Sequence, residues 1–488
     1  MSRMRLLAAL AVAVCTGIVV LTATVGLTGS TPGAAAAAAL LAPLAGWLAW
    51  RRPILPIESA PRARGLEIVS GVATICALIV LTRLAIFMID PSKVGTSTVP
   101  ASTWEVRHSC LSAYFVAAQA AGQGHNPYDN TLYDLPNDNP SGIRKPRTIG
   151  PFNVDVYEYP PPFLLLPRLL GLLAPDFLRF RSLWFALNLA IVLVVLPVVA
   201  RALGPPAATR AMLLAPLVLF AIPTLSGLQK GNIQLVIIAL SMLAMVCFQR
   251  RQWAAGGALL AYTTASKLFP GLLVLYLLGR RQWRAAIWTV AMGLVYVGAT
   301  LADVGWTPMR GFLTHLPGLL GGEAFPAFRN PAAMAINASV PGLVFKLKLF
   351  GVPGMGFVMA RIVGTASTAA VAWLLLRAAR TPRADVEQPF VWLSILVLAT
   401  LCSPFLPQAY SGYPPLWLLT LLAATAVPTR KSLALVVAAC IGLSMFWPLD
   451  WPIDPRLLAV ANAVPQSLTI GIAVLGIRRR PAAATALR

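Results

Sequence analysis

The sequence predicts an all-α integral membrane protein, a polytopic helical bundle of about 12–14 transmembrane helices with one large external loop. Of the 488 residues, 58% are hydrophobic and only 11% are charged, whereas soluble proteins carry about 25% charged residues. The hydrophobic residues form repeated continuous runs rather than an alternating pattern, which argues against a membrane β-barrel. Short basic clusters separate the runs, as is typical of cytoplasmic loops.

The net charge of +23 would also suit a nucleic-acid-binding protein, but the basic residues are confined to these clusters. We therefore expect anionic membrane lipid, and no nucleic acid, as the partner of the basic residues. Five of the six cysteines lie in or beside apolar runs, and only Cys110 falls in the large polar loop. The sequence predicts no disulfide framework, and because it has no CxxC or HExxH motif it predicts no metal site and no cofactor.

The apolar runs and the basic clusters together predict one topology, with both termini in the cytoplasm. The predicted units are an extra N-terminal hairpin (1–65), a transmembrane core with the external loop 90–163 (66–303), a second external region (304–352) and C-terminal helices (353–488). This topology puts most of the acidic residues and all three histidines outside. The predicted helices span 6–28, 34–50, 66–89, 182–200, 211–226, 231–248, 253–266, 268–279, 284–302, 353–376, 388–402, 414–428, 432–447 and 458–477.

The external loop 90–163 is the longest polar interval of the chain, so any chemistry is expected there first. Within it, the segment 109–123 has apolar residues at helical spacing, which predicts an amphipathic helix on the outer membrane surface. A short apolar piece, 163–173, follows a triple proline and contains Pro167 and Arg168. We interpret this piece as interfacial or re-entrant.

Two carboxylates are the first candidates for a catalytic base. Asp90 ends the third predicted helix just before Pro91, and Glu105 lies beside Arg107 in TWEVRHSC. A carboxylate held at a rigid helix end, or beside a cation, can accept a proton from a hydroxyl group. The structural alternatives are a helix terminus and a solvated loop. The secondary acid/base candidates are His108, Asp155 and Glu158.

Cationic side chains near the outer surface are candidates for binding a phosphate group. Lys230 (SGLQKGNIQ) and Lys267 (YTTASKLFP) lie at predicted external helix junctions, where a lysine can either extend to the surface or bind a lipid-linked phosphate. Arg361 lies inside a predicted span, and an ionisable residue there is a candidate functional group. Arg107 completes this predicted set.

Several stretches resemble glycosyltransferase family 87, the polyprenyl-phosphate-sugar-dependent mannosyltransferases and their relatives, within the membrane glycosyltransferases of the C superfold. The resemblance covers roughly residues 90–419, and the first two helices lie outside it. The matching stretches are AYFVAAQAAGQGHNPYD (113–129), YEYPPPF (157–163), GNIQLVIIAL (231–240), SKLFPGLLVLYLLGRRQWRA (266–285), NASVPGL (337–343) and SPFLPQAY (403–410).

The resemblance implies an inverting, metal-independent transfer of a hexose (mannose-like) or pentose from a polyprenyl-phosphate donor to a lipid or glycan acceptor on the extracytoplasmic face. An external carboxylate would act as the base, and basic residues would hold the leaving phosphate. Tyr159, Asn232 and Asn337, which lie in or beside matching stretches, are predicted to contact substrate. The chain departs from the family at Cys110, where the family pattern has Asp four residues before Tyr114.

Other functions fit a polytopic protein with a large external loop. A transporter or flippase of lipid-linked glycans should show charged residues paired near mid-membrane and inverted repeats, and the sequence shows neither pattern clearly. A polymerase or ligase of surface glycans and a non-catalytic member of the family remain as further alternatives. The departure at Cys110 leaves Glu105 or Asp90 to serve as the base if the protein is an enzyme.

Overall fold

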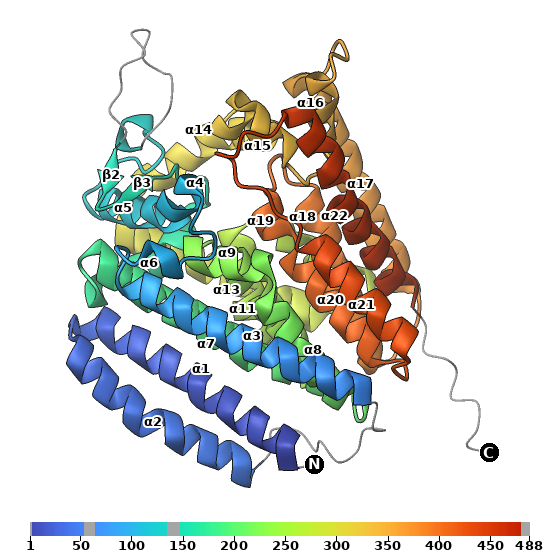
Figure 1. Ribbon diagram of the computed structural model, residues 1–488. Coiled ribbons are helices and arrows are strands. Elements are labelled where there is room, and N and C mark those ends of the chain that lie inside the picture. Colours follow the sequence, from blue (N-terminus) through green and yellow to red (C-terminus); the bar gives the residue numbers. More distant parts are fainter. Residues whose placement is uncertain (1, 53–63, 134–146, 480–488) are drawn as a thin grey trace.

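The computed structural model describes residues 2–52, 64–133 and 147–479, which form an α-helical bundle (Figure 1). The first half contains α1 Ser2–Thr28, α2 Thr31–Arg51, α3 Arg64–Ile89, α4 Thr103–Arg107, α5 Cys110–Gly122, α6 Leu165–Leu173, α7 Phe177–Arg201, α8 Ala207–Phe220, α9 Ile222–Lys230 and α10 Gln234–Gln249. The second half contains α11 Trp253–Ser266, α12 Leu272–Gly279, α13 Trp283–Val304, α14 Thr307–Gly321, α15 Pro331–Ala335, α16 Gly342–Leu349, α17 Phe357–Arg380, α18 Gln388–Leu401, α19 Gln408–Ser411, α20 Tyr413–Ala424, α21 Arg430–Leu443 and α22 Pro455–Arg478. The predicted all-α membrane fold is confirmed.

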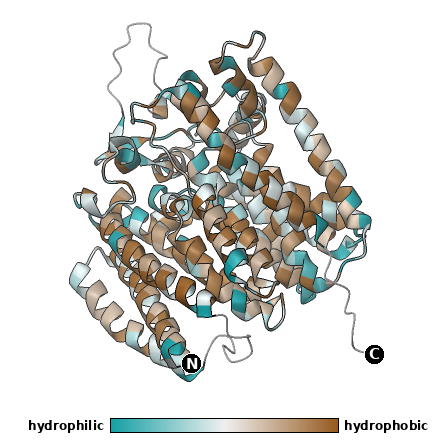
Figure 2. Ribbon diagram, turned by 45° about the vertical axis from the view of Figure 1, so that its right-hand side comes forward, coloured by the Kyte–Doolittle hydropathy of each residue, from teal (hydrophilic) through white to brown (hydrophobic). Residues whose placement is uncertain are grey.

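Seven helices of the described chain are long and apolar enough to cross a membrane, namely α1, α2, α3, α7, α13, α17 and α22. The pair α8 and α9, bent by 59° at its break, forms either an eighth, broken span or a re-entrant loop. The other predicted transmembrane segments are helices of 8–16 residues, such as α10, α11, α12 and α18. Figure 2 shows hydrophobic residues along most of the long helices and hydrophilic residues mainly at their ends and in the loops.

The N-terminal hairpin lies at one side of the bundle, where α1 packs against α2, α3 and α7 (Figure 1). Helix α2 is the outermost of these helices, and its large apolar side chains Leu40, Leu44 and Trp47 are at least half exposed. Exposed apolar side chains on a long helix fit a surface that faces lipid. The boundary predicted near residue 65 adjoins residues 53–63, which lie outside the described chain.

The short helices α4, α5, α14 and α15 lie at one end of the bundle, together with a three-stranded sheet of order β1–β3–β2 (Figure 1). Strand β1 (His108–Ser109) pairs in parallel with β3 (Phe152–Val154), and β2 (Thr148–Ile149) pairs antiparallel with β3. The beginning of α1 and the end of α22 lie away from this sheet. No strand was predicted, because two- and three-residue strands produce no periodic pattern.

Helix α5 forms where an amphipathic surface helix was predicted, but it is buried on nearly all sides. Its alanines allow close packing, and its aromatic residues Tyr114 and Phe115 contact Trp184 and Phe180 of α7. Strand β3 and helix α6 pack against it as well. The helix therefore belongs to the protein core, and the residues at its N-terminus border an internal cavity.

Candidate active site

A cavity of about 780 Å³ lies where the external loop meets the ends of the membrane helices. Polar side chains line one region of it, and apolar side chains line another. The polar region is formed by Glu105, His108, Cys110, Asn153, Asp155, Glu158, Tyr159, Lys230, Asn232, Gln234, Lys267 and Tyr410. The cavity therefore brings together most of the predicted site residues, which are up to 162 positions apart between Glu105 and Lys267.

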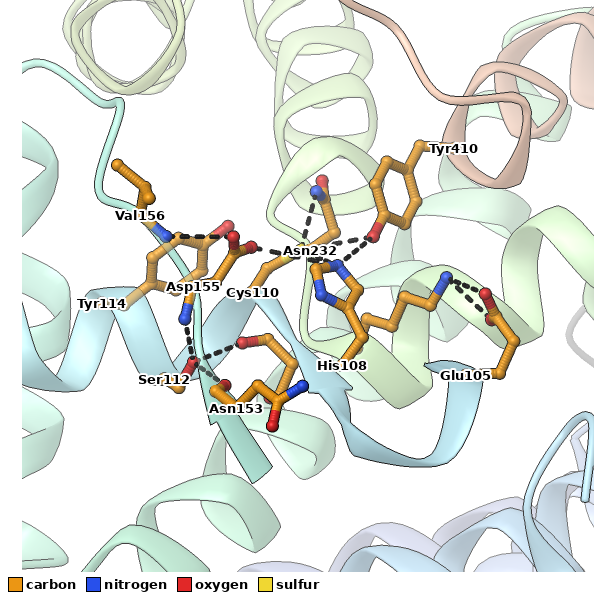
Figure 3. Close-up of polar contacts among 12 residues, drawn as sticks. Glu105, His108, Cys110, Ser112, Tyr114, Asn153, Asp155, Val156, Asn232 and Tyr410 are labelled. Carbon is orange, nitrogen blue, oxygen red and sulfur yellow. Dashed lines mark hydrogen bonds and ion pairs between the residues drawn. The ribbon is translucent and has the colours of Figure 1, made fainter. Parts of the chain in front are cut away.

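The small sheet explains why His108 and Asp155 meet. The parallel pairing of β1 with β3 sets His108 opposite Asn153 and Ser109 opposite Val154. Asp155 follows β3 directly, and Cys110 follows β1 directly. Figure 3 shows the side chains of all three residues converging on one point, so a contact between segments 45 residues apart defines this part of the site.

Asp155 is held by its backbone and is half-buried. Its N–H donates to Ser112 Oγ over 2.9 Å, and its carboxylate accepts a hydrogen bond of 2.9 Å from the backbone N–H of Val156. Burial raises the pKa of Asp155 to about 6, although the hydrogen bond from Val156, a hydrogen bond with the Cys110 side chain and the charge of Lys230 act in the opposite direction. At neutral pH the group is still mostly ionised, and it is a stronger base than an ordinary aspartate.

His108 stands between the aromatic ring of Trp104 and the Asp155 carboxylate. Its ring stacks on Trp104 with a centroid distance of 4.9 Å. Its Nε2 atom lies 3.9 Å from Asp155 Oδ2 and 3.4 Å from the hydroxyl of Tyr410. Burial and the nearby Lys230 lower the pKa of His108 to about 3, so the imidazole is neutral at physiological pH.

Cys110 faces the same point from the start of α5. Its Sγ atom lies 3.8 Å from His108 Nε2, 3.3 Å from the Tyr410 hydroxyl and 3.4 Å from Asn232 Nδ2. Burial raises the pKa of the thiol to about 11, so the thiol is a poor base. A carboxylate nevertheless reaches this position, because Asp155 approaches it from β3.

Glu105 and Lys230 form a buried ion pair at a neighbouring point of the cavity. Lys230 Nζ lies 2.9 Å from Oε1 and 2.7 Å from Oε2 of Glu105, and both side chains are at most 4% exposed. Gln229 donates to the backbone carbonyl of Glu105. Asp450 accepts hydrogen bonds from the Ser102 hydroxyl and the Trp104 N–H at the start of α4. The Glu105 carboxylate is thus fixed against a cation.

The backbone around Lys230 depends on Gly231. Helix α9 ends at this glycine, whose φ of 68° is left-handed, a conformation that favours glycine. Its carbonyl accepts from Trp184 Nε1 over 3.0 Å. The next residue, Asn232, accepts from the N–H of Gln234 at the start of α10. This turn directs both the Lys230 and the Asn232 side chains to the cavity.

Lys267, at the end of α11, contacts no carboxylate at ion-pair distance among the interactions of the described chain. Its ammonium group donates to Gln234 Oε1 over 2.9 Å and lies 5.4 Å from the centre of the Tyr159 ring. Burial lowers its pKa to about 8, while the nearby Glu158 raises it. Burial and Asp155 raise the pKa of Glu158 well above its ordinary value. Lys267 is therefore the cavity cation best able to accept an anionic ligand.

Four predicted residues do not line the cavity. Asp90 accepts from the N–H and hydroxyl of Ser92, in a turn that ends α3. Arg107 is exposed, and Arg361 pairs with Glu323 at 2.6 Å on the exposed side of α17. The fourth residue is Asn337.

The Asn337 side chain is fully buried, and its amide is used within the protein. It donates to Pro404 O over 3.0 Å and accepts from the N–H groups of Ser339 and Leu406. These bonds join the turn before α16 to the segment before α19. The structure thus gives this residue a role in the fold, next to the cavity-lining Ile336.

Tyr410 and Asp450 belong to the site but were not predicted as site residues. Tyr410 lies in SPFLPQAY, a stretch that the resemblance did single out, yet nothing in its local sequence indicates that it reaches His108. Asp450 was interpreted only as the polar end of a span. Tyr410 contacts His108 and Asp450 contacts Ser102, and each pair is more than 300 positions apart in the sequence. A single sequence contains no signal for such distant contacts.

Comparison with known proteins identifies relatives of this fold. The model of glycosyltransferase family 87 matches residues 157–404. An alpha-(1->3)-arabinofuranosyltransferase of Mycobacterium tuberculosis is 31% identical over 246 residues, 49% of this chain and 51% of the relative. A polyprenol-phosphate-mannose-dependent alpha-(1-2)-phosphatidylinositol pentamannoside mannosyltransferase of the same species is 29% identical over 235 residues. These residues are 47% of this chain and 49% of the relative. The matches thus span about half of each relative, and no solved structure matches significantly.

Proposed function

The chain belongs to glycosyltransferase family 87, and from this premise we propose that it transfers a sugar from a polyprenyl-phosphate donor to a lipid or glycan acceptor. The donor sugar is mannose-like or a pentose, since one relative is named as a polyprenol-phosphate-mannose-dependent mannosyltransferase and another as an arabinofuranosyltransferase. The observation that supports this most is the cavity, in which a half-buried carboxylate and a partly buried lysine face the same space.

Asp155 acts as the general base in this proposal. It accepts the proton of the acceptor hydroxyl as the hydroxyl oxygen attacks the anomeric carbon of the donor. The bond between that carbon and the phosphate oxygen breaks on the opposite face, so the anomeric configuration inverts. The N–H of Val156 holds the Asp155 carboxylate through a hydrogen bond of 2.9 Å, and the neutral His108 lies 3.9 Å from it. The sequence-based candidates Glu105 and Asp90 are less suited, since Glu105 pairs with Lys230 and Asp90 lies outside the cavity.

Lys267 stabilises the departing polyprenyl phosphate. A phosphate is already a good leaving group, so a cation near its oxygens supplies most of the help that the reaction needs. Tyr159 and Gln234 keep the ammonium group at the cavity surface. Glu158 lies near this lysine and raises its pKa, against the effect of burial. Lys230 and Asn232 line the same cavity and complete its polar surface.

The apolar region of the cavity accommodates the polyprenyl chain. It is formed by residues after α11 and on α14, including Leu268, Phe269, Phe312, Leu316 and Leu320. Leu268 and Leu320 are about half exposed, which suits contact with hydrocarbon. A donor with its phosphate near Lys267 would place its first isoprene units against these side chains.

The site faces the extracytoplasmic side in this proposal. The loops that form the cavity gather at the end of the bundle away from the start of α1 and the end of α22 (Figure 1). Basic clusters such as Arg51–Arg52 and Arg478–Arg479 adjoin those other helix ends, and basic loops favour the cytoplasmic side. Both termini would therefore be cytoplasmic.

A transfer assay in membranes tests the proposal. Membranes containing the protein are supplied with labelled polyprenyl-phosphate mannose or polyprenyl-phosphate arabinofuranose and with a cell-envelope extract as the source of acceptors. We expect the label of at least one donor to appear in glycolipid or glycan, and Asp155→Asn to remove it. Asp129→Asn, in the same loop but bonded to Thr131, is the matched control. Transfer no greater than in membranes without the protein would refute the proposal.

A further inference from the structure

His108, Cys110 and Asp155 present three potential metal ligands to one point at the polar side of the cavity. The Nε2 atom of His108 lies 3.8 Å from Cys110 Sγ and 3.9 Å from Asp155 Oδ2, and the three ligand atoms all lie within 4.8 Å of one another. The residues come from β1, the start of α5 and the residue after β3. We propose that they form a binding site for one divalent ion of the zinc class.

The distances fit such an ion. Tetrahedral zinc has bonds of about 2.0–2.3 Å to nitrogen, oxygen and sulfur, which sets its ligand atoms about 3.3–3.6 Å apart. The two separations from His108, 3.8 and 3.9 Å, exceed these values by only a few tenths of an ångström, and the third, between Cys110 and Asp155, is within 4.8 Å. Small rotations of the side chains close that difference. The combination of thiolate, imidazole and carboxylate suits zinc or cobalt rather than magnesium or calcium, which prefer oxygen ligands.

The charges also balance. One thiolate and one carboxylate offset the two positive charges of the ion, and His108 binds as a neutral imidazole. One nearby cation, Lys230, is already compensated by Glu105 at 2.7 Å. Metal binding displaces the thiol proton of Cys110 to solvent, since the metal binds the thiolate form. The complete site is therefore close to neutral within a partly buried environment.

Neighbouring side chains support each ligand. Asn232 Nδ2, 3.4 Å from the Cys110 sulfur, can donate to a thiolate, and the Tyr410 hydroxyl lies 3.3 Å from it. Trp104 stacks against the His108 ring, and Ser112 holds the backbone of Asp155. Such outer contacts orient metal ligands and strengthen binding. They come from α4, α5, α19 and the turn between α9 and α10, so the geometry of the site is fixed by the tertiary fold.

The fourth position of the ion opens to the cavity, because all three ligands line it. A water molecule or a substrate hydroxyl can take that position, as at zinc sites with three protein ligands. The inference concerns ion binding and rests on the geometry of the three residues. The proposed transfer uses the metal-free form of the chain, in which the Asp155 carboxylate is free to accept the proton, and an ion bound at this site would therefore block that step.

Cobalt titration of the purified, metal-stripped protein in detergent tests the site. We expect one Co²⁺ per chain, with the thiolate-to-cobalt charge-transfer absorption of a Cys ligand, and displacement of the cobalt by Zn²⁺. Cys110→Ser should remove the charge-transfer band, and His108→Gln and Asp155→Asn should each weaken binding by at least about tenfold. Cys402→Ser is the matched control, since this thiol borders the same cavity but bonds to Leu398 O.

Cys110→Asp guards against a folding defect as the cause of lost binding, because it keeps a potential metal ligand at this position, the aspartate that the resemblance to family 87 implies there. This variant should bind cobalt without the charge-transfer band. Absence of stoichiometric cobalt binding in the wild-type protein, or a charge-transfer band that survives in Cys110→Ser, would overturn the inference. The titration needs neither donor nor acceptor, so its failure leaves the proposed transfer standing, and failure of the transfer leaves the ion site standing.

Discussion

Two acidic regions of the cavity use their charges in opposite ways. Glu105 is almost fully buried and both of its carboxylate oxygens contact Lys230. Asp155 is half-buried, its pKa is raised, and the lysine beyond it, Lys267, has an amide rather than a carboxylate as its hydrogen-bond partner. In the proposed function, the Glu105–Lys230 pair maintains the shape of the site, whereas Asp155 and Lys267 remain available to substrate.

The largest expected effect is that of Asp155→Asn, which removes the proposed base without changing the side-chain volume. We expect kcat/KM of the transfer to fall by about 10²–10⁴-fold, the usual contribution of general base catalysis, with little change in thermal stability. Labelled-donor transfer and thermal unfolding in detergent measure the two quantities. If the Asp155→Asn variant transferred sugar at the wild-type rate, the base would be another residue. The proposed difference in role between Glu105 and Asp155 would then be wrong.

Glu105→Gln should mainly affect stability, because it leaves the Lys230 ammonium group buried without a counter-ion. Breaking a buried pair in this way costs about 3–5 kcal/mol, and the double variant Glu105→Gln/Lys230→Met should recover part of that loss. Glu323→Gln breaks the exposed pair with Arg361 and should cost less than about 1 kcal/mol. Equal losses of unfolding free energy for Glu105→Gln and Glu323→Gln would contradict the structural role.

Lys267→Met tests the proposed role of the Lys267 ammonium group in binding the donor phosphate. Loss of one charge-assisted contact to the donor phosphate corresponds to about 1.5–3 kcal/mol, so kcat/KM should fall roughly 10–100-fold. Lys267→Arg, which keeps the charge, should restore part of the activity. Steady-state kinetics with varied donor concentration measure the effect. A variant with unchanged kinetics would mean that the phosphate binds elsewhere in the cavity.

Cys110→Asp combined with Asp155→Asn moves the carboxylate from β3 to the start of α5. The two side chains converge on one point. We therefore expect kcat/KM of the double variant to be at least roughly tenfold higher than that of Asp155→Asn alone, which is within the usual contribution of general base catalysis. Cys402→Asp in the same background places the carboxylate at another part of the cavity and should recover nothing. Equal recovery by both variants would refute the idea of one shared base position.

Asp90→Asn should have the smallest effect. Its carboxylate accepts only from Ser92 in a turn outside the cavity, and surface changes of this kind alter stability by no more than about 0.5 kcal/mol. Because Asp90 lies outside the cavity and its substitution barely changes stability, transfer activity should stay within about twofold of the wild type. A strong loss of activity in this variant would place the chemistry at the end of α3 and contradict the proposed site.

Local patterns predicted the helices well, since long apolar runs determine where a membrane helix begins and ends. The helix over 109–123 and the positions of Lys230 and Lys267 at helix ends followed from the same patterns. The pairing of β1 with β3 could not be predicted, and it is this pairing that ranks Asp155 above Glu105. A sequence reveals which carboxylates exist, whereas the choice between a buried ion pair and an available base depends on contacts across the fold.

The convergence of Cys110 and Asp155 also bears on how the family diversifies. Two elements that point at one spot can each supply the carboxylate, so a chain with an acid at either of the two positions could present it to the same part of the cavity. Two close carboxylates would also repel each other, which favours the loss of one. A motif search that requires an acid at position 110 would therefore discard enzymes whose carboxylate has merely changed its place in the chain.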